Sequence, residues 1–363
     1  MSRTILSVAY PLTEVGPDAV GGSEQILTLL DRALTEAGHR SVVIAARGSK
    51  VRGTLIASPA AGKRLHNAAR GYGQRVHNRL IREALASFNV DLIHMHSLDF
   101  HCYLPPPGVP VLATLHLPPD WYPRRIFQSR RRYFHLNCVS RAQHRSCPES
   151  RVLVPPIANG VDVDKLAVRA RKDNFVVALG RICPEKGFHF ALDAARAAGV
   201  RLILGGEVFP YAAHLRYFRR QILPRLGRGC EYAGPLSFTE KRRLLARARC
   251  LVVPSTVAET SSLVAMEALA CGTPVVAFRV GALPEIIENG RTGLIVSDVE
   301  EMALAFHAVR RIDPGACRRA ARARFSAERM AGSYFDLYSA LIAEKENDLR
   351  EEIQARWARA AAS

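Results

Sequence analysis

Short apolar runs alternate along this chain with longer segments in which apolar residues recur at helical spacing. The helical spacing predicts a helix over residues 23–37, which Gly38 would end, and another over residues 187–198. Ser237 and Glu240 have the spacing of a capping box and predict the start of a third helix. The apolar runs predict strands at residues 5–9, 41–46, 91–94, 109–114, 136–139, 175–179, 201–204, 250–253 and 274–277.

The same strand–helix alternation occurs in both halves of the chain and predicts an α/β fold with two doubly wound, Rossmann-like parallel sheets. A polar, charged linker at residues 163–173 separates the halves. We expect one domain at residues 1–165, a second at 166–330, and a C-terminal helix and charged tail at 331–363, with the helix packing on the first domain. Ligands of such sheets bind beyond the carboxyl ends of the strands, so the loops of both domains are expected to face a cleft.

Length and composition limit the class of protein. A chain of 363 residues with 48% hydrophobic residues suits two globular domains. It has no uninterrupted apolar run of about 18 residues, and the apolar run at the N-terminus is too short for a signal peptide, so we expect a cytoplasmic protein. The eight cysteines are scattered without a Cys-x-x-Cys pair, which predicts reduced, structural thiols.

The net charge of +18, carried mostly by arginine, has three interpretations. It can reflect a compositional bias with solvated helix faces, or attraction to anionic lipid or a phosphorylated acceptor, which would allow peripheral contact with the inner face of a membrane. Binding to nucleic acid is the third, but the chain has no recognisable nucleic-acid-binding motif, so we expect no such partner. The first two interpretations stay open.

Two glutamates eight positions apart, Glu259 and Glu267, provide the first candidate chemistry. We expect Glu259 in a loop and Glu267 inside the following helix, with Ser261 or Ser262 at the helix N-terminus, where free amides and the helix dipole attract phosphate. One carboxylate for sugar hydroxyls and another for a ribose diol match a nucleotide-sugar site. Apolar residues flank Glu267, so its carboxylate needs a partner, and a ribose diol would serve.

Glycines and cations stand at other strand–helix junctions. Gly21 and Gly22 precede the first predicted helix, where they allow a ligand to approach the backbone closely. Arg181 and Lys186 lie five positions apart between a predicted strand and helix, and they can hold a phosphate by a bidentate contact and a point charge. Gly206 lies in a tight turn after another strand.

Three histidines, His94, His96 and His116, lie at the ends of predicted strands. His94 and His96 have no accompanying acidic cluster at ligand spacing, so we do not expect a metal site. We interpret His94 as a core histidine with satisfied hydrogen bonds, and we leave the role of His96 open.

In order and spacing, these motifs resemble those of the retaining glycosyltransferases of family 4, which have the GT-B fold. The resemblance extends to about residue 343 and includes the run Asn159-Gly160-Val161-Asp162, where Asp162 is also a local capping group. It departs at Ser261-Ser262, where the family commonly has Phe-Gly. The resemblance implies a catalytic set of His116, Glu259, Arg181 and Lys186 and a donor-binding set of Gly21, Gly22, Arg181, Lys186, Gly206, Ser261, Ser262, Leu263 and Glu267.

The function that follows is retaining, metal-independent transfer of a hexosyl group from a nucleotide-diphosphate sugar, without a further cofactor. Family frequency favours a UDP-sugar. The acceptor is open among a glycan, a lipid-linked molecule and a small molecule. The alternatives are a GT-B sugar phosphorylase or sugar-phosphate synthase, and a basic binding protein without catalysis.

Overall fold

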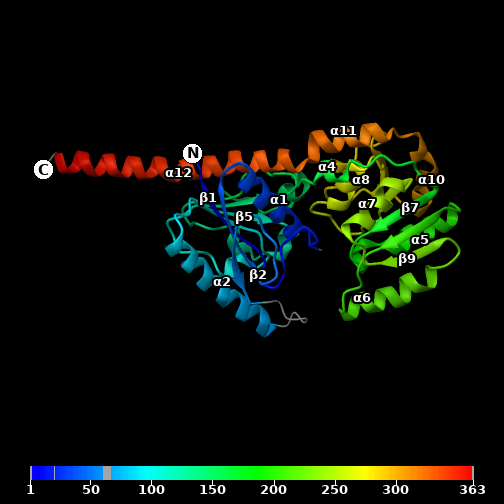
Figure 1. Cartoon of the computed structure of the whole chain (residues 1–363), viewed down its shortest axis with the longest axis horizontal. Helices are drawn as coiled ribbons and strands as arrows, with labels where there is room; N and C mark the ends of the chain where they lie inside the picture. Colours follow the sequence, from blue (N-terminus) through cyan, green and yellow to red (C-terminus); the bar gives the residue numbers. More distant parts are fainter. Residues whose placement is uncertain (1, 20, 60–66, 362–363) are drawn as a thin grey trace. The chain divides into compact units, whose positions relative to one another are not determined.

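The computed structural model describes residues 2–19, 21–59 and 67–361 (Figure 1). These residues form two compact units, and each has its own parallel sheet and core. The first unit contains residues 1–139, 144–157 and 330–363, and the second contains residues 140–143 and 158–329. The chain therefore contributes to the first unit from both of its ends.

The first unit is built on a parallel sheet that has six strands within the described residues, in the order β3-β2-β1-β4-β5-β6. Its inner strands are buried along nearly their whole length, as expected for a sheet covered on both faces. Helix α1 (Gly22–Glu36) buries Ile26, Leu27, Leu30 and Leu34, which recur at helical spacing. The strands are β1 (Thr4–Val8), β2 (Arg40–Ala46), β3 (Thr54–Ser58), β4 (Leu92–Met95), β5 (Val111–Leu115) and β6 (Phe134–Cys138). The further helices are α2 (Asn67–Ser87) and α3 (Arg141–Ser146). Helix α3 is divided between the two units.

The C-terminal helix α12 (Ala327–Ala361) is one continuous helix, coloured orange to red in Figure 1. From residue 330 it belongs to the first unit. The hydroxyl of its buried Tyr338 forms a hydrogen bond of 2.7 Å with Nδ1 of His94. Further along the helix, acidic side chains form ion pairs with Arg3 and Arg132. The helix is thus joined to the sheet by a buried polar contact as well as by charges at the surface.

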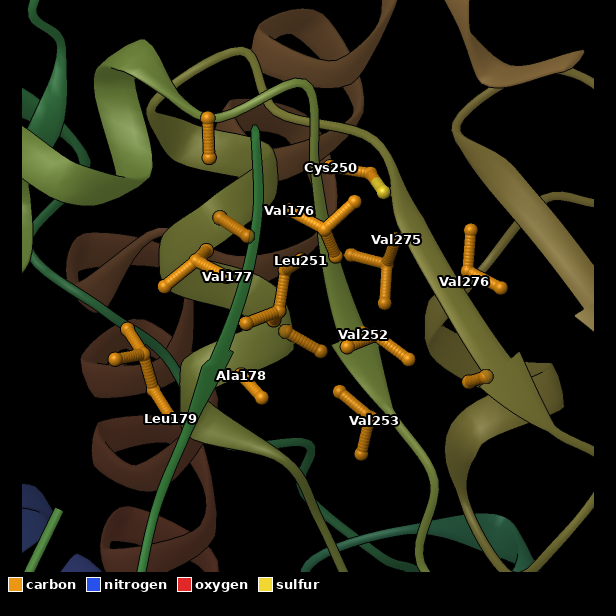
Figure 2. Close-up of a cluster of buried hydrophobic side chains, with 14 of the residues drawn as sticks. Val176, Val177, Ala178, Leu179, Cys250, Leu251, Val252, Val253, Val275 and Val276 are labelled. Carbon is orange, nitrogen blue, oxygen red and sulfur yellow. The ribbon is translucent and has the colours of Figure 1, made fainter. Parts of the chain in front are cut away.

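The second unit has a parallel sheet, again of six strands within the described residues, in the order β12-β11-β10-β7-β8-β9. Valine, leucine, alanine and cysteine from its inner strands form the core in Figure 2. The strands are β7 (Phe175–Leu179), β8 (Arg201–Gly205), β9 (Cys230–Gly234), β10 (Cys250–Val253), β11 (Val275–Phe278) and β12 (Gly293–Val296). The helices are α4 (Val163–Leu166), α5 (Phe188–Ala197), α6 (Ala212–Tyr217), α7 (Phe238–Arg247), α8 (Leu263–Ala270), α9 (Leu283–Ile286), α10 (Val299–Ala308) and α11 (Pro314–Phe325).

The α/β fold predicted from the sequence is confirmed, and each predicted strand is present with ends shifted by at most two residues. Three strands were missed: β3, β9 and β12, all at the edges of their sheets. β3 and β9 are partly exposed, and polar residues or a glycine limit their apolar runs to three residues or fewer, so they lack the longer run that identified the buried strands. The predicted capping box at Ser237 and Glu240 and the cap of α4 by Asp162 are both present.

Within the described residues, none of the helices combines the length and apolar character needed to cross a membrane. The eight cysteines are free thiols, and Sγ of Cys138 lies 3.4 Å from Sγ of Cys147.

Candidate active site

The loops at the carboxyl ends of β7 and β10 bring one of the two predicted phosphate-binding cations, Lys186, to one of the two glutamates, Glu259. Arg181 follows β7 directly after Gly180 and is exposed, and Lys186 ends the short 3-10 helix η4 (Pro184–Lys186). Nζ of Lys186 lies 2.5 Å from Oε1 of Glu259, and Ser255 Oγ donates a hydrogen bond to the same oxygen. The sequence prediction named Lys186 and Glu259 separately, and the structure joins them in one ion pair.

The pair is largely removed from water, since the Glu259 side chain is 11% exposed and that of Lys186 is 28% exposed. A carboxylate at this depth needs charge compensation, which Lys186 supplies together with the Ser255 hydroxyl. Both side chains therefore keep a defined position on loops that would otherwise be free to vary.

Gly187 and Gly281 allow the neighbouring loops to approach each other. Gly187 has φ +61°, and a Cβ there would lie 2.2 Å from the carbonyl oxygen of Pro254. Beside it, the amide of Thr256 donates to the carbonyl oxygen of Glu185 at 3.0 Å. A Cβ on Gly281 would lie 2.3 Å from the carbonyl oxygen of Glu259. These contacts fix the backbone on both sides of the Lys186–Glu259 pair.

Gly206, predicted to contact the donor, lies against the backbone of the Arg181 loop. Its φ is +147°, and a Cβ would be only 1.8 Å from the carbonyl oxygen of Gly180. Backbone hydrogen bonds from Gly180 to Gly205 and from Ile182 to Glu207 join the two turns. This close approach by itself requires a glycine at position 206, whether or not a ligand binds there. Contact between Gly206 and a donor stays a prediction.

The N-terminus of α8 follows Glu259 by a few residues. Ser262 is the buried N-cap residue but makes no side-chain capping bond, and Leu263 is the first helical residue. The Oγ atom of Ser261 is buried and has no hydrogen-bond partner among the described residues. Because the first amides of a helix have no intrahelical acceptor, this end offers several donors to an anion.

Glu267 lies one turn further inside α8, with 7% of its side chain exposed. Its Oε1 is 2.5 Å from Nζ of Lys241, which comes from α7. From the sequence, a ribose diol was the expected partner of this carboxylate, and Lys241 was not predicted as its partner. The only sequence signal was the capping box at Ser237, which places Lys241 in the second turn of a helix but says nothing about its partner.

Gly21 and Gly22 are at the start of α1 as predicted, with Gly21 as the N-cap; Val20 lies outside the described residues. The carboxylate of Glu24 folds back over this end, so that a Cβ on Gly21 would lie 1.9 Å from Oε2 of Glu24. Thr13 Oγ1 donates to Glu24 Oε1 at 2.7 Å. The helix end therefore already has a negatively charged neighbour, which the sequence did not indicate.

The three histidines form a row across β4 and β5 in the first unit. His94 forms hydrogen bonds with Tyr338 through Nδ1 and with Thr114 through Nε2, both at 2.7 Å. The prediction that it is a core histidine with satisfied hydrogen bonds is therefore confirmed. His96 Nδ1 lies 3.1 Å from Nε2 of His116, and the two rings are stacked. Burial lowers the pKa of His116 to about 4, so its imidazole is neutral at pH 7.

A group of possible metal ligands is present at the loop that carries Arg181 and Lys186. Cys183, Glu185 and His214 each offer one ligand atom, and these atoms lie within 4.8 Å of one another. Glu185 is exposed, and Arg181 places a positive charge nearby. The sequence-based expectation that the reaction needs no metal stays a prediction.

Two family models match this chain, one on each half. The model described as Glycosyltransferase Family 4 matches residues 20–165, and the model described as Glycosyl transferases group 1 matches residues 173–311. Together they cover the second sheet, every strand of the first sheet except β1, and the two glutamates. The chain belongs to the family 4 glycosyltransferases.

Among characterised family 4 glycosyltransferases and their relatives, the chain is 35% identical over 178 residues to a glycogen synthase of Mycobacterium tuberculosis. The match covers 46% of this chain and 42% of that protein, so the chain matches less than half the length of this relative.

Solved structures show the same architecture. A sucrose-phosphate synthase from Thermosynechococcus elongatus has a TM-score of 0.77 at 20% identity, covering 94% of this chain and all of that one. The Anabaena protein HepE, solved in complex with UDP-glucose, has a TM-score of 0.70 at 19% identity, covering 93% of this chain and 99% of that one. This family 4 glycosyltransferase thus has the GT-B fold of two Rossmann-like domains.

Proposed function

We propose that the protein transfers a hexosyl group from a nucleotide-diphosphate sugar to an acceptor, with retention of configuration and without a metal ion. The observation that carries this proposal is the pairing of both motif glutamates with lysines in one unit: Lys186 with Glu259, and Lys241 with Glu267. The second unit thereby holds a half-buried carboxylate at Glu259 and a buried one at Glu267, each with an adjacent cation, on the loops and helices where a nucleotide-sugar would bind.

Arg181 and Lys186 are proposed to bind the diphosphate. The bond between the sugar and the diphosphate breaks with a gain of negative charge on the leaving oxygen. Preformed positive charge at that oxygen therefore stabilises the transition state more than the ground state. The exposed guanidinium of Arg181 is open to a ligand, whereas Lys186 must divide its contacts between Glu259 and a phosphate oxygen.

Glu259 is proposed to position the transferred sugar by accepting hydrogen bonds from its hydroxyls. As the glycosidic bond lengthens, the sugar gains oxocarbenium character, and a nearby carboxylate stabilises that positive charge. The acceptor attacks from the same face that the diphosphate leaves, and a phosphate oxygen takes the acceptor's proton. Glu259 is therefore a stabilising group in this proposal and not a nucleophile.

Glu267 is proposed to accept hydrogen bonds from the ribose diol, with the amides at the start of α8 and the hydroxyls of Ser261 and Ser262 close to the phosphates. The unpartnered Oγ of Ser261 supports this assignment, because a buried hydroxyl gains from a ligand that bonds it. UDP is the favoured nucleotide, as in HepE, which was solved with UDP-glucose. For His116, Gly21 and Gly22 in the first unit, contact with the sugar or the diphosphate stays a prediction of the sequence.

The test incubates purified protein with UDP-, GDP- and ADP-sugars and measures release of the nucleoside diphosphate. We expect slow release from one donor, lost in Glu259→Gln and kept in Glu231→Gln. Glu231 is a suitable control because it lies on the edge strand β9 and forms an exposed ion pair with Arg201 of β8.

Parallel reactions with inorganic phosphate and with sugar phosphates as acceptors separate the alternatives. Formation of a sugar 1-phosphate from a glycan and inorganic phosphate, without a nucleotide-sugar, would indicate a phosphorylase. Release of the nucleoside diphosphate that requires a sugar phosphate would indicate a sugar-phosphate synthase. If no donor is turned over and no nucleotide stabilises the protein, the transferase proposal is wrong and a binding protein without catalysis becomes the better explanation.

A further inference from the structure

The second unit has a charged pocket at the amino ends of its strands, whereas the proposed donor site is at their carboxyl ends. It has a volume of about 290 Å³, and its lining includes Lys172, Arg249, Pro274 and Arg310. Lys172 precedes β7, Arg249 precedes β10 and Pro274 precedes β11, so the pocket is at the amino ends of three neighbouring parallel strands. Arg181 and Lys186 follow the carboxyl end of β7, about 15 Å away along a five-residue strand.

Lys172 lines this pocket and has no carboxylate partner among the residues that the structure describes. Its Nζ donates to the carbonyl oxygen of Ala246 at 2.9 Å and to Thr273 Oγ1, which are both uncharged acceptors. Burial lowers the pKa of Lys172 to about 8, so a large fraction of the amine is still charged at neutral pH.

Arg249 and Arg310 add two more cations to the pocket. Arg249 is 5% exposed, and its Nη1 donates to the carbonyl oxygen of Phe306 at 3.1 Å. Arg310 is exposed at the rim, where its Nη2 donates to Asn174 Oδ1 at 2.8 Å. Burial, and then the charge of Arg310, lower the pKa of Arg249, which indicates that the two guanidinium groups repel each other.

The carboxylate in the lining does not neutralise these three cations. Asp173 is already paired with Arg247, whose Nε lies 2.7 Å from Oδ2 of Asp173. Within the described part of the chain, no ion pair joins Lys172, Arg249 or Arg310 to an acidic side chain. Buried lysine and arginine without an acidic partner are rare, because a desolvated charge is costly.

The helix ends beside these cations account for only part of the charge. Lys172 and Arg249 each donate to a carbonyl group in the last turn of a helix, α7 and α10 respectively, where the helix dipole favours a cation. Each such terminus is equivalent to about −0.5 charge, so the two together offset about one of the three positive charges. About two positive charges remain without compensation.

We propose that this pocket binds a small molecule bearing a phosphate dianion, at a site separate from the donor site. An ammonium group and two guanidinium groups from three segments of the chain suit a compact anion with several acceptor oxygens. The charge of a phosphate dianion matches the uncompensated charge. The volume also leaves room for a small organic group attached to the phosphate, so the ligand is either inorganic phosphate or a phosphate monoester.

Calorimetric titration with inorganic phosphate and with glucose 6-phosphate, at constant ionic strength, tests the proposal. The variants are Lys172→Met and Arg310→Ala in the pocket, Arg181→Ala in the donor site, and Arg219→Ala as an exposed arginine outside both. Arg310 is exposed and bonds one surface amide, so its replacement leaves the core intact.

We expect at least one probe to bind the wild-type protein. Each pocket variant should weaken that binding about tenfold or more, whereas Arg181→Ala and Arg219→Ala should leave it unchanged. Tighter binding of glucose 6-phosphate would assign the site to a phosphate monoester, and equal binding would assign it to the phosphate group alone. The proposal is wrong if neither probe binds, if Arg310→Ala has no effect, or if Arg181→Ala alone abolishes binding.

Discussion

The ammonium group of Lys241 and the carboxylate of Glu267 form an ion pair of 2.5 Å between helices α7 and α8. The side chain of Glu267 is 7% exposed and that of Lys241 is 22% exposed, so the pair is mostly shielded from water. In the proposed donor site, a ribose diol would therefore bind a carboxylate that already has a cationic partner. Lys241 gives this carboxylate a cationic partner and holds its position when no donor is bound.

Replacing Lys241 with methionine should destabilise the protein, because it leaves a buried carboxylate without a partner. Breaking a buried pair in this way costs about 3 kcal/mol. The double variant Lys241→Met/Glu267→Gln should recover part of the loss. Urea unfolding measures this, with Arg201→Met as the control, since the exposed Arg201–Glu231 pair should contribute less than about 1 kcal/mol. Equal effects of Lys241→Met and Arg201→Met would contradict the role of Lys241.

Lys186→Ala should lower turnover of the nucleotide-sugar by about 100-fold or more, because it removes positive charge from the developing diphosphate. Lys165→Ala is the matched control: Lys165 forms an ion pair with Asp162, but its side chain is 60% exposed. The initial rates of diphosphate release give kcat and KM for both variants. If the activity of Lys186→Ala is within threefold of that of the wild type, the assignment of Lys186 to phosphate binding is wrong.

Gly187→Ala should reduce both stability and activity more than Gly199→Ala. Both glycines have φ +61°, so both substitutions carry the same backbone strain of about 1–2 kcal/mol. At Gly199 a Cβ would meet nothing within 4 Å, whereas at Gly187 it would collide with the carbonyl oxygen of Pro254 and displace the loops that hold Lys186 and Glu259. Thermal unfolding and donor turnover of the two variants separate the effect of backbone strain from the effect of displacing the loops. Equal losses in the two variants would show that the loop contact is unimportant.

The buried His77 should make the first unit less stable in acid. Burial lowers its pKa from 6.5 to about 4 in the folded protein. Between these values the unfolded chain binds more protons, so this contribution to stability is complete above pH 6.5 and is lost as the pH falls toward 4. The full shift corresponds to about 3 kcal/mol.

His77→Phe should therefore flatten the dependence of the unfolding free energy on pH between 7 and 5. His307→Ala provides the control, because it removes an exposed histidine instead of a buried one. Denaturant unfolding at several pH values measures the slope, and an unchanged slope in His77→Phe would contradict the assignment.

Much of the fold could be predicted because the central strands are buried on both faces. A strand such as β10 is then a continuous apolar run that stands out from its polar surroundings. The edge strands β3 and β9 contact solvent and have no such run, so only their pairing with β2 and β8 defines them. Helices with clear start signals, such as α7, were also predictable, because caps act through residues close in sequence.

The sequence alone determined the positions of the candidate chemistry: two glutamates eight residues apart around a helix start, and two cations between a strand and a helix. Local geometry sets these relationships, so spacing reveals them. Only the tertiary structure decided which charges meet. It paired Glu267 with Lys241 across 26 positions, and in the described part of the chain it brought Lys172, Arg249 and Arg310 together without an acidic partner. Such contacts depend on how strands and helices distant in sequence pack, and residue spacing carries no information about that packing.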